Sequence, residues 1–423
     1  MKAEERKNLI KGIMAGTPFA TGHQLVYRGV TDKFNVYQIP LDYLVYNPYN
    51  GRVGSVVKSY EKQSHTLDPE NPDDAKIIED FLWQSKESAN KATLDNLRAN
   101  GQINFGIVTS DGMIIDGNRR ASLMNRIRHD KKSSQEEKDR CSFFKAVVLP
   151  DSATKRDILQ LETSFQMGED AKVDYNPIEK YLKCKDLEDA GFTRDEIASF
   201  MGIQKKEVDQ NLEILDLMDQ YLAFFEYDGI YTMAQGHEDS FQKLNIAYKQ
   251  YKAGVANMWN YTDEDLTNML GVAFDYIRLN QPQNDVRDIF RKPSKTASSI
   301  FASKERWNKF LDKHNEEMAS YDEKPIEDYL KDATGEDITI CLKARDKEWQ
   351  KHVGQKLDDS IKEAQDEIAS QLSSNAPVLL ISKAQNALDS IDEKSKGFKE
   401  NASKISESLD TLIAAAEKLK AML

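Results

Sequence analysis

The chain has 423 residues, of which 39% are hydrophobic and 30% charged, and its formal net charge at pH 7 is -13. That length allows two or three domains, and the composition is that of a globular protein rather than a disordered or fibrous one. The acidic balance excludes wholesale wrapping of nucleic acid by a basic surface, so any DNA contact must be regional.

The spacing of the cysteines and the length of the apolar runs indicate the cellular compartment of the protein. Three scattered cysteines without CxxC spacing indicate neither a disulfide framework nor a zinc site. Residues 1–30 hold no apolar run long enough for a secretory signal, and no segment approaches about 18 uninterrupted apolar residues. We therefore expect a cytoplasmic protein with no membrane contact.

The first part of the chain mixes predicted strands and helices. NVYQIPLDYLVYNPYNGR, from Asn35, predicts a strand, alone or with one helical turn, that runs into a loop. Helical spacing follows at residues 77–82, and a helix around Leu94 and Leu97 is expected to stop at Gly101. INFGIVTSDGMIIDG predicts a β-hairpin, because Asp-Gly between apolar runs favours a tight turn. HDKKSSQEEKDR is expected to be an exposed loop, and CSFFKAVVLP a buried strand.

Beyond residue 152 the patterns are helical. One helix is expected over residues 153–168, and DYNPIEKYLKCKDLEDAG predicts another, with Pro177 in its first turn. FTRDEIASFMGIQKKEVDQNLEIL predicts two helices separated by Gly202. The first would begin at Thr193 with a capping box, and the second would run from Gln204 to about residue 215. Several amphipathic helices follow over residues 230–330.

The last part of the chain has the period of a coiled coil. Spacings of three and four alternate through the apolar seam Leu388, Ile391, Ser395, Phe398, Ala402, Ile405, Leu409, Leu412, Ala416, Leu419 and Leu423. The run from Leu357 to Leu372 could form an opposing arm, with SSNAP as the turn. An intermolecular coiled coil, which would make a homodimer or bind a protein partner, and a stripe packed on its own chain remain open alternatives.

The stretch DGNRRASL carries the strongest chemical signal. Gly117 follows a strand pattern and precedes a helix pattern, so it can let a ligand approach the main chain beside free helix N-H groups. Arg119 and Arg120 lie where the helix dipole disfavours cations. A bound phosphate would explain them, because guanidinium groups pair with phosphate oxygens. The alternative is that both arginines pair with acids elsewhere in the fold.

Several ordered motifs resemble the ParB/sulfiredoxin superfamily over about residues 36–215. DGNRRASL is similar to its Gly-Glu-Arg-Arg motif, and IPLDYLVYNPYNGR to its first motif, with Asn47, Pro48 and Arg52 as counterparts. LETSFQMGEDAKVDYNPIEKY is similar to a third motif, and the residues around Gly202 resemble the family's helix-turn-helix. The counterparts in the third motif are Glu162, Gln166, Asn176, Pro177 and Glu179.

The resemblance implies a fold and a ligand. We expect an α+β ParB/sulfiredoxin-like domain, then an all-α region with a helix-turn-helix, and a C-terminal helical hairpin or coiled coil. The expected segments are an N-terminal extension (1–34), the nucleotide-binding domain (35–152), helical domains (153–229 and 230–350) and the tail (351–423). The resemblance also implies CTP or ATP with Mg²⁺, bound by Arg52, Asp116, Gly117, Asn118, Arg119, Arg120 and, as metal ligand, Glu162.

Departures from the family pattern bear on catalysis. Asn118 replaces the family's glutamate and Thr163 its asparagine, so hydrolysis can be slow, altered or absent; Asn118 and Glu162 are the catalytic candidates. The segment before Asn176 and the insertion over residues 58–96 are also long. Sulfiredoxin activity is disfavoured, because it would need a cysteine at position 118.

DNA binding depends on the second helix of the pair around Gly202. Its outward residues Gln204, Lys205, Lys206 and Gln210 could contact phosphates and base edges. Against this, residues 193–212 hold one more acidic than basic residue. The first interpretation is therefore a DNA-binding protein in which the nucleotide switches DNA engagement or dimer closure. The alternative is an NTP-hydrolysing nuclease or a phage-defence or mobile-element effector of the same superfamily, with Asp111, Asp116, Glu162, Glu169 and Asp170 as candidate carboxylates.

Overall fold

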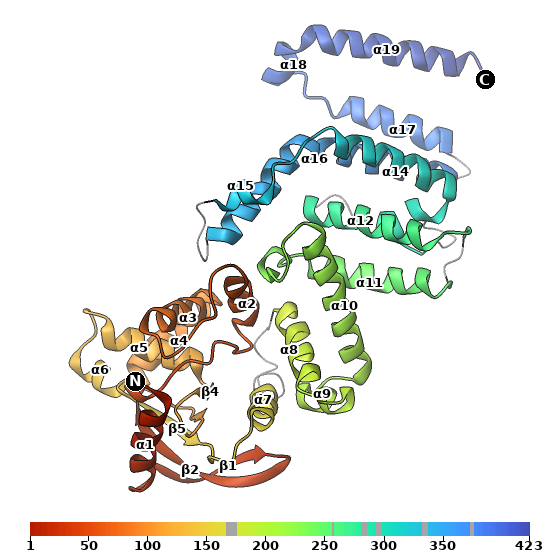
Figure 1. Cartoon of the computed structure of the whole chain (residues 1–423). Coiled ribbons are helices and arrows are strands. Elements are labelled where there is room, and N and C mark those ends of the chain that lie inside the picture. Colours follow the sequence, from red (N-terminus) through yellow and green to blue (C-terminus); the bar gives the residue numbers. More distant parts are fainter. Residues whose placement is uncertain (166–175, 256–257, 281–285, 293–297, 332–336, 373–375) are drawn as a thin grey trace.

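The structure is a computed structural model of the whole chain (Figure 1). An α/β domain forms one end, a helical region the middle, and the last helices of the chain the other end. No helix in the described part of the chain is long and apolar enough to cross a membrane. The structure describes residues 1–165, 176–255, 258–280, 286–292, 298–331, 337–372 and 376–423.

A five-stranded sheet organises the N-terminal domain. Its order is β1-β2-β5-β3-β4, with every pair antiparallel except the parallel pair β3 and β5. The β3–β4 hairpin turns at Asp111-Gly112, as the sequence predicts. The strands are β1 (Ala20–Tyr27), β2 (Val30–Pro40), β3 (Gly106–Val108), β4 (Ile114–Asp116) and β5 (Phe143–Val148).

Helices cover one face of this sheet and the space beyond it (Figure 1). The apolar sides of these helices share a core with Ile39, Phe144 and Val148 of the sheet. The helices are α1 (Ala3–Met14), α2 (Gly54–Gln63), α3 (Pro72–Gln84), α4 (Glu87–Asn100), α5 (Asn118–His129) and α6 (Gln135–Arg140), and one 3₁₀ turn, η1 (Leu41–Tyr43), follows β2.

Most predicted elements of this domain are confirmed, and four were missed: α1, β1, α2 and α6. The strand after Asn35 continues into a helical turn, α4 stops at Gly101, and the buried strand is β5. The segment 1–34, expected to be an extension, instead supplies α1, β1 and the start of β2. It belongs to the domain because Ile10 and Leu25 are buried in its two cores. Part of the expected exposed loop is the short helix α6.

The helical region shares one large core. Apolar residues from Ile178 to Leu182 and from Ile214 to Ile368 belong to one cluster, which spans the expected boundaries at 229/230 and 350/351. The elements of this region are α7 (Lys155–Thr163), α8 (Pro177–Asp189), α9 (Arg194–Met201), α10 (Lys205–Phe224), η3 (Tyr231–Met233), α11 (Glu238–Lys252), α12 (Asp263–Leu279), α13 (Arg287–Phe290), η4 (Ile300–Ala302), α14 (Lys304–Ala319), α15 (Ile326–Leu330) and α16 (Asp337–Leu372). A separate small cluster lies around α9 and includes Phe192, Ile197 and Met201.

The helix pair around Gly202 forms where it was predicted. Thr193 and Glu196 make the expected capping box at the start of α9. Gly202 ends α9 in the left-handed conformation, with φ at 66°. Gln204 is the N-cap residue of α10, which continues beyond the predicted end to Phe224. The use of this pair as a DNA-reading helix-turn-helix stays a prediction.

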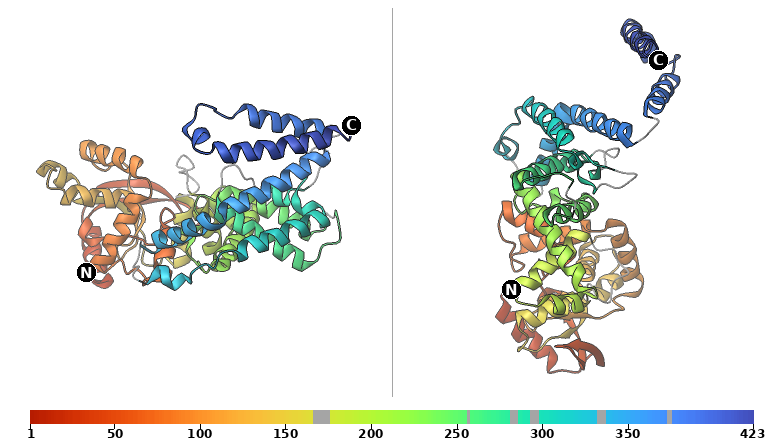
Figure 2. Two further views of the ribbon diagram at one scale, coloured as in Figure 1. Left: turned by 90° about the horizontal axis from the view of Figure 1, so that it is seen from above. Right: turned by 90° about the vertical axis from the view of Figure 1, so that its right-hand side faces the viewer.

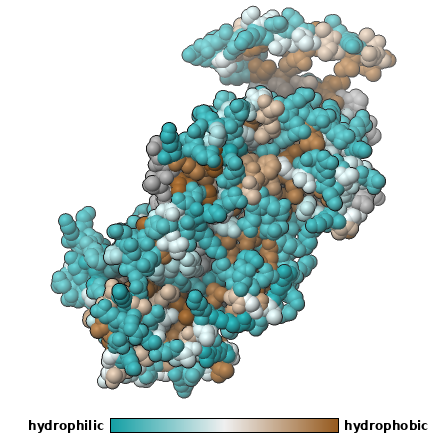
Figure 3. Space-filling model, in the orientation of Figure 1, coloured by the Kyte–Doolittle hydropathy of each residue, from teal (hydrophilic) through white to brown (hydrophobic). Residues whose placement is uncertain are grey.

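The tail begins with two helices in contact, because Lys383 of the helix that follows residue 375 pairs with Asp366 of α16 at 2.7 Å. Leu357 and Ile361 are fully buried in the helical core, so the stripe over residues 357–372 packs on its own chain. The seam that follows is interrupted after Asp389, and its parts are α17 (Ala376–Asp389), α18 (Lys396–Glu400) and α19 (Ala402–Lys420). Of these helices α17 contacts α16, and Figure 3 shows apolar residues on the surface of this part of the molecule, at the top of the picture (Figure 2 gives two further views of it). An intermolecular role of α17–α19 stays a prediction.

Candidate functional site

A cavity of about 540 Å³ lies where the β3–β4 hairpin, α4 and the start of α5 meet. Its wall combines cationic, amide and aromatic side chains from segments far apart in the sequence. All the predicted nucleotide-binding residues except Glu162 lie in this wall. The lining residues are His23, Asn50, Arg52, Thr93, Ile103, Asn104, Phe105, Asp116, Gly117, Asn118, Arg119, Arg120 and Phe165.

Gly117 is the N-cap residue of α5, and among the described residues no side chain caps this helix N-terminus at the cavity. Its φ of 103° lies in the left-handed region, and a Cβ there would come within 2.6 Å of the Phe144 ring. Both the backbone angle and the space therefore require glycine. The α5 helix begins at the next residue, without an acidic side chain in its first turn. Its first N-H groups and its dipole favour an anion at this point.

Arg119 contributes a charge whose described hydrogen-bond partners are neutral. Its Nε donates to the side-chain oxygen of Asn90, and a terminal nitrogen donates to the Thr93 hydroxyl at 3.0 Å. Burial lowers the pKa of Arg119, and the nearby positive charge of Arg52 lowers it further. The fold thus places the guanidinium groups of Arg52 and Arg119 in the wall of one cavity, an arrangement that an anion stabilises.

Arg120 has a different role from its neighbour. Its guanidinium forms an ion pair with Asp116 at 2.6 Å and donates to the backbone oxygens of Asn104, at 2.6 Å, and Phe105, at 3.3 Å. The side chain therefore connects the end of β4 to the loop that precedes β3. For this arginine the structure favours the alternative left open by the sequence, in which it pairs within the fold.

Asn47 joins the three motifs that the sequence analysis placed in order. Its backbone N-H donates to Oδ1 of Asn118 at 2.9 Å, and its side-chain nitrogen donates to Glu162 at 3.3 Å. Asn118 also donates from Nδ2 to the backbone oxygen of Ile114 at 2.8 Å. Both ends of this buried amide are thus engaged. The side chain orders the loop before α2, and no catalytic step follows from its position.

Glu162 lies beside the cavity wall but not in it. Its Oε2 is 3.2 Å from Nζ of Lys183, and the two side chains are only 4% and 3% exposed. This buried ion pair already compensates the charge of the carboxylate. The role of Glu162 as a metal ligand stays a prediction. Among the described residues, no group of three or more histidine, cysteine or acidic side chains is placed to hold a metal.

Of the carboxylates proposed for a nuclease site, the three that the structure describes, Asp111, Asp116 and Glu162, do not form a metal-binding group. Asp116 pairs with Arg120, and Asp111 accepts a hydrogen bond from the Thr109 hydroxyl. Glu169 and Asp170 lie outside the described residues, as does Gln166 of the third motif. A metal-dependent nuclease needs several converging carboxylates. The described residues therefore give the nuclease interpretation no support.

The loop that carries Arg52 leads directly into a contact with the helical region. Glu179 on α8 accepts hydrogen bonds from the N-H of Ser55 at 3.0 and 3.2 Å and from its hydroxyl, at the first turn of α2. Lys58 of α2 pairs with Asp186 of α8 at 2.7 Å. Burial raises the pKa of the Glu179 carboxyl, although the Ser55 bonds act in the opposite direction. One wall of the cavity is thereby tied to α8.

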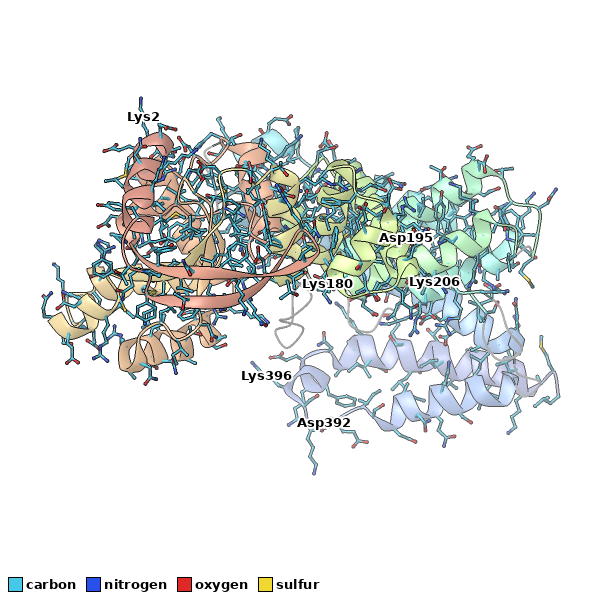
Figure 4. The ribbon with its side chains drawn as sticks, turned by 90° about the horizontal axis from the view of Figure 1, so that it is seen from below. Lys2, Lys180, Asp195, Lys206, Asp392 and Lys396 are labelled. Carbon is cyan, nitrogen blue, oxygen red and sulfur yellow. The ribbon has the colours of Figure 1, made fainter. Side chains whose placement is uncertain are left out.

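The predicted DNA-contacting residues lie on α10, apart from the cavity. Lys205 forms an ion pair with Asp195 at 2.8 Å. Lys206 is exposed and lies at the surface on the same part of the molecule as Asp195 (Figure 4). Gln204 is exposed at the N-cap, and Gln210 is partly exposed one turn further along the helix. Part of the positive charge expected for DNA is thus compensated within the fold.

Sequence reasoning missed several residues of the site. Asn90 and Thr93 belong to the long insertion, where nothing in the local pattern marks them as partners of Arg119. Lys183 is embedded in a helix pattern in which a lysine normally faces solvent. His23 lies in the segment that was set apart as an extension. Of the missed lining residues, Asn50 lies inside a quoted motif, two residues before Arg52, and could have been identified from it.

Comparisons with known proteins give little more. No family model and no curated protein sequence matches the chain. A search of solved structures finds the C-terminally truncated chromosome-partitioning protein ParB from Caulobacter crescentus, complexed with CTP-gamma-S. The identity is 15%, the match covers 52% of this chain and 98% of that chain, and the TM-score is 0.19. A TM-score this low carries no conclusion about fold, ligand or family. The observed architecture stands by itself as a small N-terminal sheet domain followed by a mostly helical region.

Proposed function

We propose that the chain binds a nucleoside triphosphate in the cavity at the start of α5. The observation that carries the proposal is the approach of Arg52 to Arg119 in the wall of that cavity, beside the N-H groups of the first helical turn. Guanidinium groups and a helix N-terminus are complementary to phosphate oxygens. A triphosphate carries enough negative charge to compensate both arginines at once.

We further propose that the nucleotide controls the orientation of the helical region. A phosphate held by Arg52 would fix the loop before α2, and Glu179 and Asp186 tie α2 to α8. A ligand shifts such an equilibrium only as far as it prefers one arrangement over the other. The proposed switch therefore requires tighter nucleotide binding when α8 is docked on α2.

DNA binding through α10 is the downstream part of this proposal. Lys206 is its best-supported contact because it is exposed, whereas Lys205 would have to exchange Asp195 for a phosphate. Gln204 and Gln210 would lie beside it along the helix. Because phosphate contacts dominate such affinity, Lys206→Gln should weaken DNA binding and reduce its salt dependence by about one ion. Fluorescence anisotropy with labelled duplex, with and without nucleotide, measures both effects.

The primary test is calorimetric titration of the full chain with ATP, CTP, GTP and UTP in the presence and absence of Mg²⁺. Arg119→Gln should weaken binding at least tenfold, because a charged hydrogen bond contributes about 1.5–3 kcal/mol. Arg128→Gln is the matched control, since Arg128 lies at the other end of α5 and pairs with Asp42 at 3.0 Å.

The outcomes of this test separate the possible roles. Binding without phosphate release would support a switch, and release of phosphate would assign an NTPase activity. Absence of binding by all four nucleotides would refute the proposal. Equal losses in the Arg119 and Arg128 variants would refute the assignment of the site.

A further inference from the structure

Part of the cavity wall, called the aromatic end below, is apolar and aromatic and is not used by the proposed phosphate site. His23 of β1 and Phe105, which precedes β3, meet there edge to face, with ring centroids 5.4 Å apart and planes at 78°. Ile103 lies in the same wall and is 64% exposed. An apolar and aromatic surface thus continues from the cationic surface within one cavity, a combination that fits a ligand with a planar group beside an anionic one.

The sheet register explains why the aromatic end and the proposed phosphate site are adjacent. Ile107 of β3 pairs with Asp116 of β4 in antiparallel register. If this pairing is continued beyond the ends of the two strands, Phe105 lies beside the first residues of α5. The aromatic side chain and the helix N-terminus are therefore placed by the same hairpin, and their separation is fixed by strand geometry.

Several hydrogen bonds hold the aromatic end in place. Arg120 donates to the backbone oxygens of Asn104 and Phe105. The buried Gln102 donates to the backbone oxygen of Lys145 at 2.8 Å and accepts from its N-H at 2.6 Å. Phe19 packs against the Phe105 ring, with centroids 6.1 Å apart. A wall fixed in this way binds a ring without first being ordered, which lowers the entropic cost of binding.

We propose that His23, Ile103 and Phe105 form the nucleobase wall of the site. The inference rests on the proposed function, because the phosphates held by Arg52 and Arg119 would direct the base toward this end. Stacking on aromatic rings tolerates every base, since each has a π-face. Among the described lining residues, the polar side chains near these rings are those of His23 and Asn104 and the Asp116–Arg120 ion pair, which is already engaged within the fold. The wall therefore selects nucleotides over inorganic phosphates and discriminates weakly among bases, with larger purines favoured.

The test compares nucleotides with inorganic triphosphate on the full chain by calorimetric titration. His23→Ala and Phe105→Leu each remove an aromatic ring and keep both arginines. Each should weaken ATP binding roughly tenfold, the usual size of one lost base stack. Both should leave binding of inorganic triphosphate within about twofold of the wild-type value. Arg119→Gln should weaken both ligands together.

Phe143→Leu is the matched control, because Phe143 is another partly exposed aromatic side chain of the same domain and does not line the cavity. It should change neither affinity. If inorganic triphosphate binds the wild-type chain as tightly as ATP, the nucleobase wall is refuted while the phosphate site stands. The nucleobase wall would also be refuted if the His23 and Phe105 variants lost affinity for ATP and for inorganic triphosphate equally. If neither ligand binds, the proposed function itself fails.

Discussion

The buried pair of Glu162 and Lys183 permits a sharp test of the arrangement around the site. The two charged atoms are 3.2 Å apart, and the side chains are only 4% and 3% exposed. The second carboxylate oxygen accepts from Asn47 at 3.3 Å. Lys183→Met removes the ammonium group and keeps most of the side-chain volume. A buried carboxylate that loses its counter-charge costs about 3–5 kcal/mol of folding free energy.

The assay is urea-induced unfolding followed by far-UV circular dichroism at pH 7. Combining Lys183→Met with Glu162→Leu should restore most of the lost stability, because an apolar pair often replaces a buried ion pair at little cost. Lys185→Met is the control on the same helix, since Lys185 is 47% exposed and pairs with Asp189 at the surface. Its loss should stay below about 1 kcal/mol. Equal losses in the Lys183 and Lys185 variants would refute the buried-pair reasoning.

Three further outcomes follow from packing, burial and exposure. Gly117→Ala should lower the free energy of unfolding by about 2–4 kcal/mol, measured by denaturant titration, because its Cβ adds left-handed strain to overlap with Phe144. Burial raises the pKa of the Glu179 carboxyl, so the folded state favours its protonated form. The stability that this protonation contributes is present at low pH and is lost as the pH rises through the raised pKa. Glu179→Gln should remove this loss, seen as a smaller difference between unfolding midpoints at pH 5 and pH 8. Deleting residues 376–423 should leave the thermal midpoint of the body unchanged, whereas Leu357→Ala should cost about 2–5 kcal/mol because Leu357 is fully buried.

Local signals predicted the parts of the fold that local physics controls. The Asp-Gly turn between apolar runs gave the β3–β4 hairpin, and the capping box at Thr193 gave the start of α9. Gly101 ended α4 as expected, in a backbone conformation with positive φ. Each of these features depends on residues within a few positions of one another, so sequence spacing is sufficient to identify it.

Features that depend on distant partners were beyond such reasoning. The apolar stripe that begins at Leu357 would have the same period whether it packed against a second chain or against its own chain. The structure shows the second arrangement, because α12 and α14 pack on this stripe. The ion pair of Glu162 with Lys183 could not be predicted, because Lys183 is far from Glu162 in sequence and lies on a different helix. Likewise, Arg119 is held by Asn90, 29 positions earlier in the chain.

The adjacent arginines show how helix geometry changes the interpretation of a motif. Successive residues on an α-helix point about 100° apart, so Arg119 and Arg120 cannot act as a symmetric pair. Arg120 reaches back one turn to Asp116 and fixes the loop before β3, while Arg119 turns toward α4 and the charge of Arg52. The second cation of the proposed phosphate site therefore comes from position 52. Replacing Arg120 should therefore weaken nucleotide binding by displacing Phe105, whereas replacing Arg119 should weaken it by removing a contact with the phosphates.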